Sequence, residues 1–275
     1  MIPEQTVHLS ISIVTYYPDP VQFSVLLKSL GRALSFCSAS DNTFSYCITV
    51  VDNGNQRAFL ESGLDESGLL PYAGIISNSS NLGYGKAHNQ AIRKIKSTFH
   101  LILNPDVILY EDSLHCALKH MQDNPVCVAL SPETRGADGK YQYLCKTYPT
   151  VADLALRGFS PWPIKKHFDF RLSLYENRKL VHDRKTAPAS IISGCFMFCR
   201  TEVLQKLGGF NEKFFLYFED FALSLELGKL GRIDYVPEVK VVHFGGNAGG
   251  KGMRHICNFI KSAGIFFSLY GWKWR

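Results

Sequence analysis

The chain has 275 residues, of which 46% are hydrophobic and 20% are charged. That composition is typical of a folded globular protein and argues against global disorder. The length suffices for one large core, or for one domain with a small appendage. No apolar run reaches the roughly 18 residues of a membrane span, and the N-terminus lacks the basic flank and apolar stretch of a signal peptide. We therefore expect a cytoplasmic protein, whose eight cysteines, without CxxC spacing, are reduced core thiols.

The net charge of +6 has its source near the end of the sequence, because residues 239–275 contain six Lys and Arg and no Asp or Glu. Large aromatic side chains accompany these charges, and such a mixture suits an anionic membrane surface or a phosphorylated partner. The alternative is a solvated C-terminal helix with one apolar face on the core. The residues are Lys240, Lys251, Arg254, Lys261, Lys273 and Arg275, with Phe259, Phe266, Phe267, Tyr270, Trp272 and Trp274.

Apolar periodicity predicts alternating strands and helices along the first half of the chain. Short connections between alternating strands and helices indicate a parallel α/β architecture. In chain order, we expect a strand at 9–17, a helix at 21–36, strands at 46–51 and 73–77, a helix opened by 81–85 and running to about 96, a strand at 100–103, a helix at 112–122 and a strand at 126–130.

The pattern is less regular between residues 134 and 186, where Asp138-Gly139 is typical of a hairpin turn. Residues 157–185 hold eight Lys and Arg against three Asp and Glu. Because binding loops are carried by rigid scaffolds, this basic insert is where we expect variable binding specificity. A solvated face is the alternative. The aromatic residues of the insert include Trp162, Phe168, Phe170 and Tyr175.

Regular structure is expected to return with a strand at 191–199, interrupted by Ser193-Gly194. Glycine inside a strand often marks the close approach of a ligand or of other backbone. Thr201 is expected to be the N-cap of a helix that ends near Leu207. A helix from Glu219 to about residue 230 and a strand at 233–244 follow.

The stretch His100–Asp106 has the most informative pattern in the chain. Its short apolar run predicts a strand that is buried on both faces of a sheet. Pro105 lacks a backbone donor and ends the strand, which leaves Asp106 just past its carboxyl end. Open α/β sheets hold their ligands at this edge. An ordinary strand-ending turn is the alternative interpretation.

Four polar side chains fall at the ends of expected strands or the starts of helices, and they are Asp52, Asp106, Asp220 and His243. Carboxylates with a single imidazole suit Mg²⁺ or Mn²⁺ better than zinc. The glycine-rich turn at 81–85 would let backbone approach a phosphate at a helix N-terminus. This turn is neither GxGxxG nor a Walker loop, which leaves a dehydrogenase poorly supported and argues against a kinase-like ATPase.

Taken in order, these motifs resemble those of bacterial family 2 glycosyltransferases, and specifically their rhamnosyltransferase-like branch. The matching segments run from about Ile11 to Gly246, which is most of the chain. Each motif alone is weak, whereas six in the same order are strong evidence. The motifs are Val50–Gly54, Asn81–Asn89, Leu103–Asp106, Ser193–Met197, Gly209–Glu212 with Phe215–Asp220, and His243.

The resemblance implies a GT-A fold, which is an α/β fold with a Rossmann-like, mostly parallel sheet. It implies one glycosyltransferase domain over residues 1–249. Within that domain, residues of about 1–130 would form the nucleotide-sugar half and residues 131–249 the acceptor half. The basic aromatic helical tail would cover residues 250–275.

The resemblance also implies a donor site. Asp52 would accept the N3–H of a pyrimidine, and Thr15 and Tyr16 would line the base and ribose. Uracil and thymine present the same N–H, so this contact does not distinguish UDP from dTDP. The implied substrate-binding positions are Thr15, Tyr16, Asp52, Asn81, Gly83, Gly85, Lys86, Asn104, Ser193, Gly194 and Glu219.

The catalytic groups follow from the same resemblance. Asp106 stands where the family's metal-binding Asp-x-Asp motif ends, Asn104 replaces the first carboxylate, and His243 resembles the second protein ligand. The ion, Mg²⁺ or Mn²⁺, would bridge the diphosphate and stabilise the leaving group. Asp220 would be the general base of an inverting displacement. Alternatively, Glu219 and Asp220 only favour the positive end of the following helix.

The chain departs from the family pattern at three positions. Ala222 stands where an acidic residue is usual, and Glu226 stands where an Arg is usual. The two positions are four residues apart, so in relatives they would form a salt bridge on a helix, which this chain has lost. Alternatively, the usual Arg contacts a phosphate in relatives, and Glu226 would then weaken donor binding. Tyr17 stands where the family often has Asn, which bears on the nucleotide contacts.

We expect transfer of L-rhamnose from dTDP-L-rhamnose to a glycan or glycolipid in cell-surface polysaccharide or lipopolysaccharide synthesis. The expected partners are this donor and a glycan or lipid-linked acceptor. We also expect the tail to contact an anionic membrane surface, on the inner face of the cell membrane, and we expect no nucleic acid partner. The alternatives are a UDP-sugar donor (galactofuranose, galactose or N-acetylglucosamine) and a non-catalytic glycan- or membrane-binding subunit.

Overall fold

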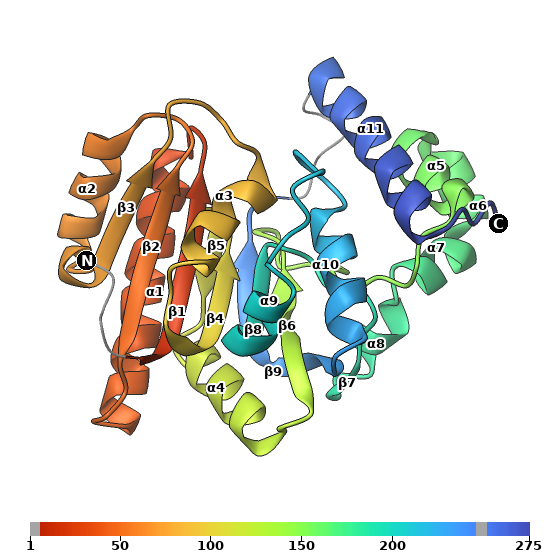
Figure 1. Ribbon diagram of the computed structural model, residues 1–275. Coiled ribbons are helices and arrows are strands. Elements are labelled where there is room, and N and C mark those ends of the chain that lie inside the picture. Colours follow the sequence, from red (N-terminus) through yellow and green to blue (C-terminus); the bar gives the residue numbers. More distant parts are fainter. Residues whose placement is uncertain (1–5, 246–251) are drawn as a thin grey trace.

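The computed structural model of the chain describes residues 6–245 and 252–275. The expected boundary between residues 249 and 250 lies outside the described residues, as do Gly246 and Lys251. Figure 1 shows a twisted sheet with helices on both faces and a further group of helices beside its second half.

The first half of the chain alternates strands and helices, as the apolar periodicity predicts. Asp19 caps α1 by accepting a hydrogen bond from the N–H of Gln22, and Pro20 fits the first helical position. The elements are β1 (Val7–Thr15), α1 (Pro20–Ser40), β2 (Tyr46–Asp52), α2 (Arg57–Glu66), the 3₁₀ turn η1 (Leu70–Tyr72), β3 (Ala73–Ser77), α3 (Tyr84–Ile92) and β4 (Ser97–Leu103).

The second half of the chain begins with a short strand that directly follows Asp106. Its elements are β5 (Val107–Leu109), α4 (Ser113–Asp123), β6 (Cys127–Arg135), α5 (Val151–Phe159), α6 (Trp162–His167), α7 (Asp169–Tyr175), α8 (Arg178–His182), β7 (Ala187–Pro188), β8 (Phe196–Arg200), α9 (Thr201–Lys206), α10 (Glu219–Gly228), β9 (Arg232–His243) and α11 (Met253–Tyr270).

All the strands join one sheet in the order β3-β2-β1-β4-β8-β6-β9-β5, with β7 paired to β9. The neighbours among β3, β2, β1 and β4 are parallel, and so are β6 and β9. Strand β8 runs antiparallel between β4 and β6. The α/β class with a mainly parallel sheet is therefore confirmed. Because β1, β2 and β4 are parallel, their carboxyl ends share one edge of the sheet.

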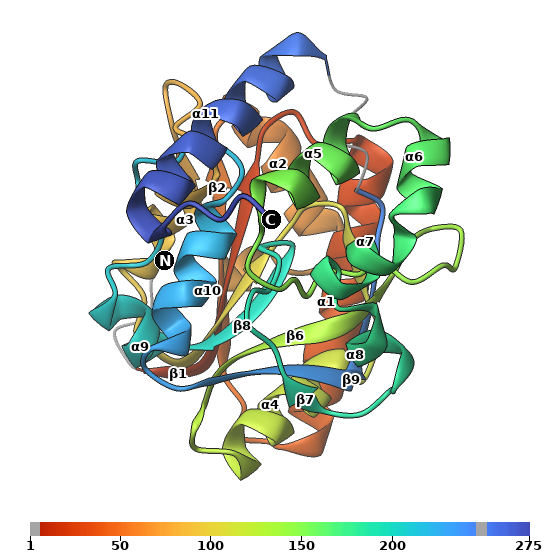
Figure 2. The same cartoon turned by 90° about the vertical axis from the view of Figure 1, so that its right-hand side faces the viewer.

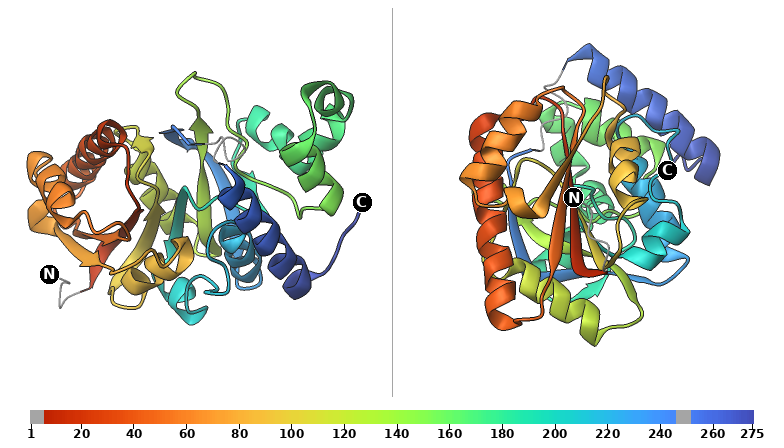
Figure 3. Two further views of the ribbon diagram at one scale, coloured as in Figure 1. Left: turned by 90° about the horizontal axis from the view of Figure 1, so that it is seen from above. Right: turned by 60° about the vertical axis from the view of Figure 1, so that its left-hand side comes forward.

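Two hydrophobic layers hold the sheet between helices. Helices α1, α2 and α4 pack on one face, and α3, α9 and α10 pack on the other. The right-hand view of Figure 3 shows the red and orange helices on one side of the sheet and the blue helices on the opposite side. With both faces covered, β4 is buried from Phe99 to Leu103, as its apolar run predicts.

A chain of buried polar groups crosses the layer between β1, β4 and α3. His100 Nδ1 lies 2.7 Å from Ser10 Oγ, and His100 Nε2 lies 2.8 Å from Ser12 Oγ. Ser12 Oγ also lies 2.7 Å from Nδ1 of His88. Burial lowers the pKa of His100 to about 3 and the pKa of His88 well below its usual value. Both imidazoles are therefore neutral in the folded protein.

Helices α5 to α8 and α11 form the face that is turned toward the viewer in Figure 2. Phe266 and Phe267 of α11 are buried in a cluster with Phe214, Phe218 and Ala222. Along this stretch the structure matches the expected helix with an apolar face on the core, so Phe266 and Phe267 are inaccessible to a membrane. None of the helices in the described ranges is both long enough and apolar enough to cross a bilayer.

Several local expectations were wrong. The strand expected at 191–199 begins only at Phe196, because Ser193 and Gly194 belong to a turn. The N-cap of α9 is Arg200, and Thr201 is its first helical residue. The irregular region at 134–186 contains four short helices, whereas its hairpin turn at Asp138-Gly139 is confirmed by the antiparallel bridge between residues 135 and 141.

Candidate active site

The carboxyl edge of the sheet brings together most of the residues that the sequence singles out. Thr15 and Asp52 end β1 and β2 as a directly paired couple. Asn104 follows β4, and its N–H donates to the carbonyl of Cys195 at 2.9 Å. The side-chain oxygen of Asn104 is buried without a hydrogen-bond partner among the described residues, beside the turn that carries Asp106. This edge therefore presents polar oxygen atoms in a row.

The Asp52 carboxylate is fully buried and organises the turn that follows β2. Its two oxygens accept hydrogen bonds from the N–H groups of Gly54 at 2.9 Å and Gln56 at 2.6 Å. A carboxylate has further lone pairs, so it retains capacity for a third donor such as a pyrimidine N–H. Tyr16, half exposed beside Tyr17, lies next along the chain after Thr15.

The departure at Tyr17 has a backbone explanation. Tyr17 has a φ of 48°, which is the left-handed region. Asn adopts this region more readily than residues with bulky side chains. An Asn at this position would therefore suit the turn, and Tyr17 adopts the same conformation although its side chain tolerates it less well.

The Asn81–Gly85 turn approaches the protein's own backbone. Gly83 has a φ of 85°, and a Cβ there would lie 2.3 Å from the carbonyl oxygen of Phe215. A Cβ on Gly85 would lie 2.7 Å from Cβ of Phe210. The expectation that these glycines admit a phosphate is corrected, because the segment at 210–215 occupies the space they leave. Asn81 stabilises the turn by accepting from Gly83 N–H, and Lys86 is exposed.

Asp106 and His243 lie together at the start of β5 and the end of β9. The distance from Asp106 Oδ1 to His243 Nε2 is 3.5 Å. Neighbouring ligands of an octahedral ion with bonds of about 2.1 Å stand about 3 Å apart, so the pair has nearly the required spacing. Gly245 leaves this space open, since a Cβ there would lie 2.6 Å from both Asp106 Oδ2 and His243 Nε2. These residues fit Mg²⁺ or Mn²⁺.

Gln142, from the hairpin after β6, holds His243 in place. Its side-chain oxygen lies 2.8 Å from His243 Nδ1, and its side-chain nitrogen donates to the carbonyl oxygens of His243 and Gly245. Metal-binding histidines usually have such a partner on the other ring nitrogen. Sequence reasoning missed Gln142, because the two residues are 101 positions apart and no motif links them.

Asp220 faces the Ser193-Gly194 turn from the first turn of α10. Its carboxylate accepts from Gly194 N–H at 3.0 Å and from Phe221 N–H at 2.9 Å. The preceding residues Tyr217 and Phe218 have φ values of 72° and 66°. Two successive left-handed residues without glycine are strained, and such strain is typical of functional segments. Ser193 itself accepts from Cys195 N–H at 3.4 Å.

Glu219, which is buried, and Asp220, which is half-buried, form an acidic pair with unequal partners. Burial, together with the charge of Asp220, raises the pKa of Glu219 to about 8. Burial also raises the pKa of Asp220, against which the two backbone N–H groups act. Glu219 Oε2 is buried with no hydrogen-bond partner among the described residues. Asp220 is therefore the member of the pair that ionises first, and Glu219 keeps its proton at neutral pH.

Tyr84 lies between the two halves of the site. Its hydroxyl donates to the carbonyl of Gly194 at 2.6 Å. The pKa of Tyr84 is raised well above its usual value by burial and then by nearby acidic groups, which include Glu219, Asp220 and Asp106. Asp106 and Asp220 therefore both lie close to this phenol. Sequence reasoning did not single out Tyr84, although it lies inside the Asn81–Asn89 motif.

The two changed positions on α10 have separate environments. Ala222 is buried against the aromatic cluster with α11, where a carboxylate would be desolvated. Glu226 forms an ion pair with Lys229 at 2.8 Å. Neither residue contacts Asp220 through its side chain in any interaction of the described residues. The loss of the usual pair therefore leaves the Glu219–Asp220 end of the helix intact.

A second cluster with metal-like spacing lies at the opposite end of the sheet. The ligand atoms of His120, Cys127 and Asp234 lie within 4.8 Å of one another. Arg232 donates to both oxygens of Asp234, at 2.7 and 2.9 Å, and His120 Nε2 lies 2.9 Å from the same carboxylate. The cluster is thus a satisfied ion-pair network at the beginning of β6 and β9.

Comparison with solved structures confirms the fold. The mannosyltransferase PcManGT from Pyrobaculum calidifontis, in complex with GDP-Man and Mn²⁺, matches 90% of this chain with a TM-score of 0.60 and 16% identity. GalNAc-T7 with UDP, GalNAc and Mn²⁺ matches 89% with a TM-score of 0.61 and 14% identity. This chain covers 60% and 44% of those two chains. These likenesses define the class as an α/β protein of the GT-A type.

The family follows from the sequence profile. Residues 25–208 match the family described as Glycosyl transferase family 2, and the chain belongs to that family. It is 26% identical to the N-acetylglucosaminyl-diphospho-decaprenol L-rhamnosyltransferase of Mycobacterium tuberculosis, over 97% of this chain and 86% of the relative. It is 24% identical to the rhamnosyltransferase WbbL of Escherichia coli, over 63% of this chain and 65% of the relative. The resemblance inferred from the motifs is confirmed.

Proposed function

We propose that the protein is a metal-dependent inverting glycosyltransferase that moves L-rhamnose from dTDP-L-rhamnose to a glycan or glycolipid acceptor, in cell-surface polysaccharide or lipopolysaccharide synthesis. One observation carries the proposal: Asp106 lies beside His243 at one end of the site, and Gly194 joins Tyr84 to Asp220, since its carbonyl accepts from the Tyr84 hydroxyl and its N–H donates to the Asp220 carboxylate. The rhamnosyl donor is supported by the activity of the two relatives. Their shared sugar is therefore the first to test.

The two acidic groups have complementary roles in this reaction. Asp106 and His243 would hold Mg²⁺ or Mn²⁺, and the ion, when bound, stabilises the charge that develops on the leaving diphosphate. Asp220 accepts the proton of the acceptor hydroxyl, and the N–H groups of Gly194 and Phe221 hold its carboxylate in one orientation. Protonated Glu219 adds no negative charge beside this base.

The donor half supplies recognition of the base and ribose. Asp52 has capacity for the pyrimidine N–H, and Thr15 and Tyr16 flank it at the end of β1. The positions at 81–86 contribute by fixing the start of α3 rather than by opening space for phosphate. Both thymine and uracil satisfy such a site, so a UDP-sugar donor is the second candidate.

A panel of nucleotide sugars tests the donor. We expect the protein with Mg²⁺ or Mn²⁺ to release dTDP from dTDP-L-rhamnose. Release of UDP from UDP-galactofuranose, UDP-galactose or UDP-N-acetylglucosamine, without release from dTDP-L-rhamnose, would replace the rhamnosyl assignment. Absence of release from every donor, with nucleotide binding retained, would favour a non-catalytic binding subunit.

A lipid-linked acceptor agrees with the distribution of exposed apolar side chains. Of the twenty exposed large hydrophobic side chains found in residues 6–245 and 252–275, ten lie in two segments, 162–174 and 253–274. These segments share the face shown in Figure 2. Trp162 and Trp274 are 70% and 64% exposed, and Lys166 lies over the Trp162 ring. Aromatic and basic side chains in this combination favour an anionic membrane surface.

Vesicle binding tests the membrane contact. We expect the 275-residue chain to bind vesicles that contain phosphatidylglycerol, and expect Trp272→Ser combined with Trp274→Ser to weaken that binding. Equal binding by the wild-type protein and the variant would exclude these side chains as the contact. Substitution is preferable to deletion, because α11 also buries Phe266 against α10.

A further inference from the structure

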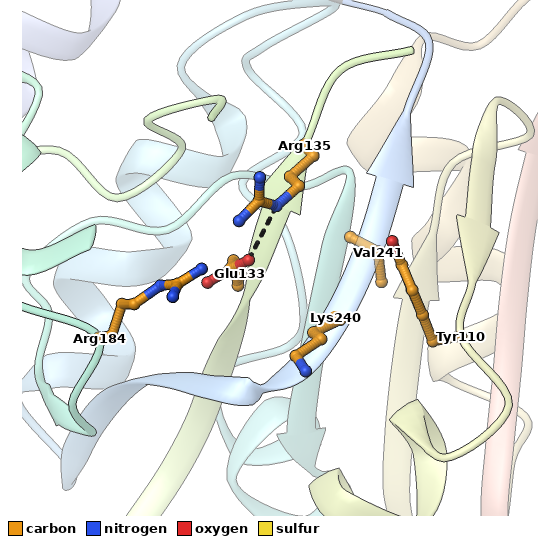
Figure 4. Close-up of a pocket in the computed structure, with 6 residues that line it drawn as sticks. All are labelled: Tyr110, Glu133, Arg135, Arg184, Lys240 and Val241. Atoms are coloured by element: carbon orange, nitrogen blue, oxygen red, sulfur yellow. Dashed lines mark hydrogen bonds and ion pairs between the residues drawn. The ribbon is translucent and has the colours of Figure 1, made fainter. Parts of the chain in front are cut away.

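A cavity outside the groups described so far lies along β6 and β9. It has a volume of about 230 Å³ and is lined by Tyr110, Glu133, Arg135, Arg184, Lys240 and Val241. Figure 4 shows that β6 and β9 supply its floor, and that Arg184 points toward Glu133 from the far side. The cavity is formed by segments from four separate parts of the sequence.

The cavity has a surplus of positive charge. Three basic side chains face one carboxylate, and that carboxylate is already engaged. Glu133 is 5% exposed and accepts from Arg135 Nε at 3.0 Å. Within the described part of the chain, neither Arg184 nor Lys240 has a carboxylate at ion-pair distance. Two uncompensated cations therefore remain for an anionic ligand.

The two guanidinium groups are held in position by one aromatic ring. Arg184 Nε donates to the hydroxyl of Tyr141 at 2.9 Å, and the guanidinium of Arg135 lies 4.2 Å from the centre of the same ring. The backbone of Arg184 has a φ of 48°, which is unfavourable for a residue with a long side chain. A strained, hydrogen-bonded Arg is pre-organised, and a planar guanidinium suits phosphate oxygens.

Lys240 is tied to the same framework through its backbone. Its carbonyl oxygen accepts from Ser113 Oγ at 2.6 Å and from Tyr110 N–H at 3.3 Å. Lys240 pairs with Glu133 across the two strands. The backbone of Lys240 thus lies directly beside that of Glu133, and the Lys240 side chain lines the same cavity as the ion pair of Glu133 and Arg135.

The cavity adjoins the candidate metal residues along the same strands. Lys240 and His243 are three residues apart on β9, which is about 10 Å of strand. Tyr110 follows β5, and β5 begins directly after Asp106. A substrate that reaches from the reaction centre along β9 would therefore present its next group to Arg184 and Lys240.

We infer that this cavity binds the phosphate or diphosphate of the acceptor, so that the acceptor is a sugar carried on a phosphorylated lipid. The inference rests on the proposed function, because it assigns the second substrate of that reaction. The positive charges of Arg184 and Lys240 match the negative charge of a diphosphate ester. The cavity lies along β6 and β9, whereas the donor residues Thr15 and Asp52 lie at the ends of β1 and β2.

Titration calorimetry in EDTA tests the cavity apart from any metal. The probes are geranyl diphosphate, inorganic pyrophosphate and dTDP, and the variant combines Arg184→Gln with Lys240→Gln. We expect geranyl diphosphate to bind the wild-type chain and to bind the variant about tenfold more weakly. The control Lys28→Gln changes an exposed lysine on α1 and should bind like the wild type.

Each other result would overturn the inference. Equal affinity of wild type and variant for geranyl diphosphate would show that the cavity binds no diphosphate. An equal loss of dTDP affinity in the variant would assign the cavity to the nucleotide. Binding of pyrophosphate without geranyl diphosphate would leave a site for free anion only.

Kinetics separate this inference from the proposed function. With a diphosphate-linked acceptor, the variant should raise the acceptor KM about tenfold and leave kcat unchanged, as expected for lost substrate binding. Release of dTDP from dTDP-L-rhamnose without acceptor reports on the donor reaction alone. If that release fails while the cavity binds geranyl diphosphate, the proposed donor is wrong and the diphosphate site stands.

Discussion

The side-chain oxygen of Gln142 lies 2.8 Å from Nδ1 of His243 and determines which ring nitrogen is available to a metal. The Gln142 nitrogen already donates to two backbone carbonyls, so its oxygen is the atom that faces the imidazole. His243 Nδ1 therefore carries a hydrogen, which leaves Nε2, the ring nitrogen 3.5 Å from Asp106 Oδ1, as the one available to a metal. Asp106 and His243 thus depend on a residue that would touch neither substrate nor ion.

Replacing Gln142 should weaken metal binding. In Gln142→Leu the ring loses its acceptor, and we expect Mn²⁺ affinity to fall about 10- to 100-fold, measured by electron paramagnetic resonance titration with dTDP present. Gln205→Leu is the matched control, since Gln205 also donates to two backbone carbonyls but lies on α9. Unchanged Mn²⁺ affinity in Gln142→Leu would contradict the orienting role.

Removing the base should abolish most transfer and spare the donor site. We expect Asp220→Asn to lower kcat about 10²- to 10⁴-fold, with the Kd for dTDP unchanged. Glu226→Gln is the control on the same helix and should retain activity. Since burial raises the pKa of Asp220, wild-type activity should increase with pH as this group loses its proton. Full turnover in Asp220→Asn would exclude Asp220 as the base.

The buried Glu219 should make the folded protein less stable as pH rises from about 4.5 to about 8. Its folded pKa of about 8 lies above the ordinary value of 4.5, so stability is complete below pH 4.5 and is lost as pH rises toward 8. Glu219→Gln removes that loss. We expect the difference in unfolding free energy between the variant and the wild type, measured in urea, to shift in favour of the variant by a few kcal/mol from pH 5.5 to pH 8.

The same measurement has an internal control. Glu226→Gln changes a partly exposed carboxylate of α10 that is paired with Lys229, and it should follow the wild type at both pH values. An identical pH dependence of wild type and Glu219→Gln would mean that Glu219 is ionised in the folded state.

The buried histidines should act in the opposite direction at acidic pH. Burial lowers the pKa of His100 to about 3, against an ordinary value near 6.5. The stability from this group is complete above pH 6.5 and is lost as pH falls toward 3, at up to about 1.4 kcal/mol per pH unit. In urea unfolding, His100→Gln should show a smaller loss between pH 7 and pH 5. The control His167→Gln changes an exposed histidine and should keep the pH dependence of the wild-type stability. If His100→Gln also kept that pH dependence, the His100 imidazole would be charged in the folded protein.

Much of the fold follows from local pattern. The strands that end at Thr15, Asp52 and Leu103 are rich in apolar, mostly β-branched residues and have polar ends, and the structure contains all three. Strand β5 has only three residues and exists because it pairs with β9, more than a hundred residues away. Helix α2 and the helices at 151–182 were missed for a related reason, because short helices depend on tertiary packing more than on periodicity.

The residues of the candidate site also fall into those that a local motif indicates and those that only tertiary contacts reveal. Asp106, Asp220 and His243 follow conspicuous segments, so the motifs were sufficient to select them. Tyr84 and Gln142 act through contacts to residues 110 and 101 positions away, and their importance appears only when the strands are assembled. The glycines at 83 and 85 allow a close approach, as expected, but the neighbour is the segment at 210–215, and sequence spacing does not show that this segment folds back over them.

Because Gly83 lies close to Phe215, the effect of a substitution at residue 83 depends on the segment that carries Asp220. Tyr84 N–H donates to the carbonyl of Phe215, which lies four residues before Glu219. A Gly83→Ala substitution pushes on that carbonyl and so on the strained backbone that holds Asp220. Substitutions at Gly83 and at Asp220 should therefore combine non-additively, with the second costing less than it does alone. In this chain, tolerance to change at residue 83 is set by the segment that leads from Phe215 to Asp220.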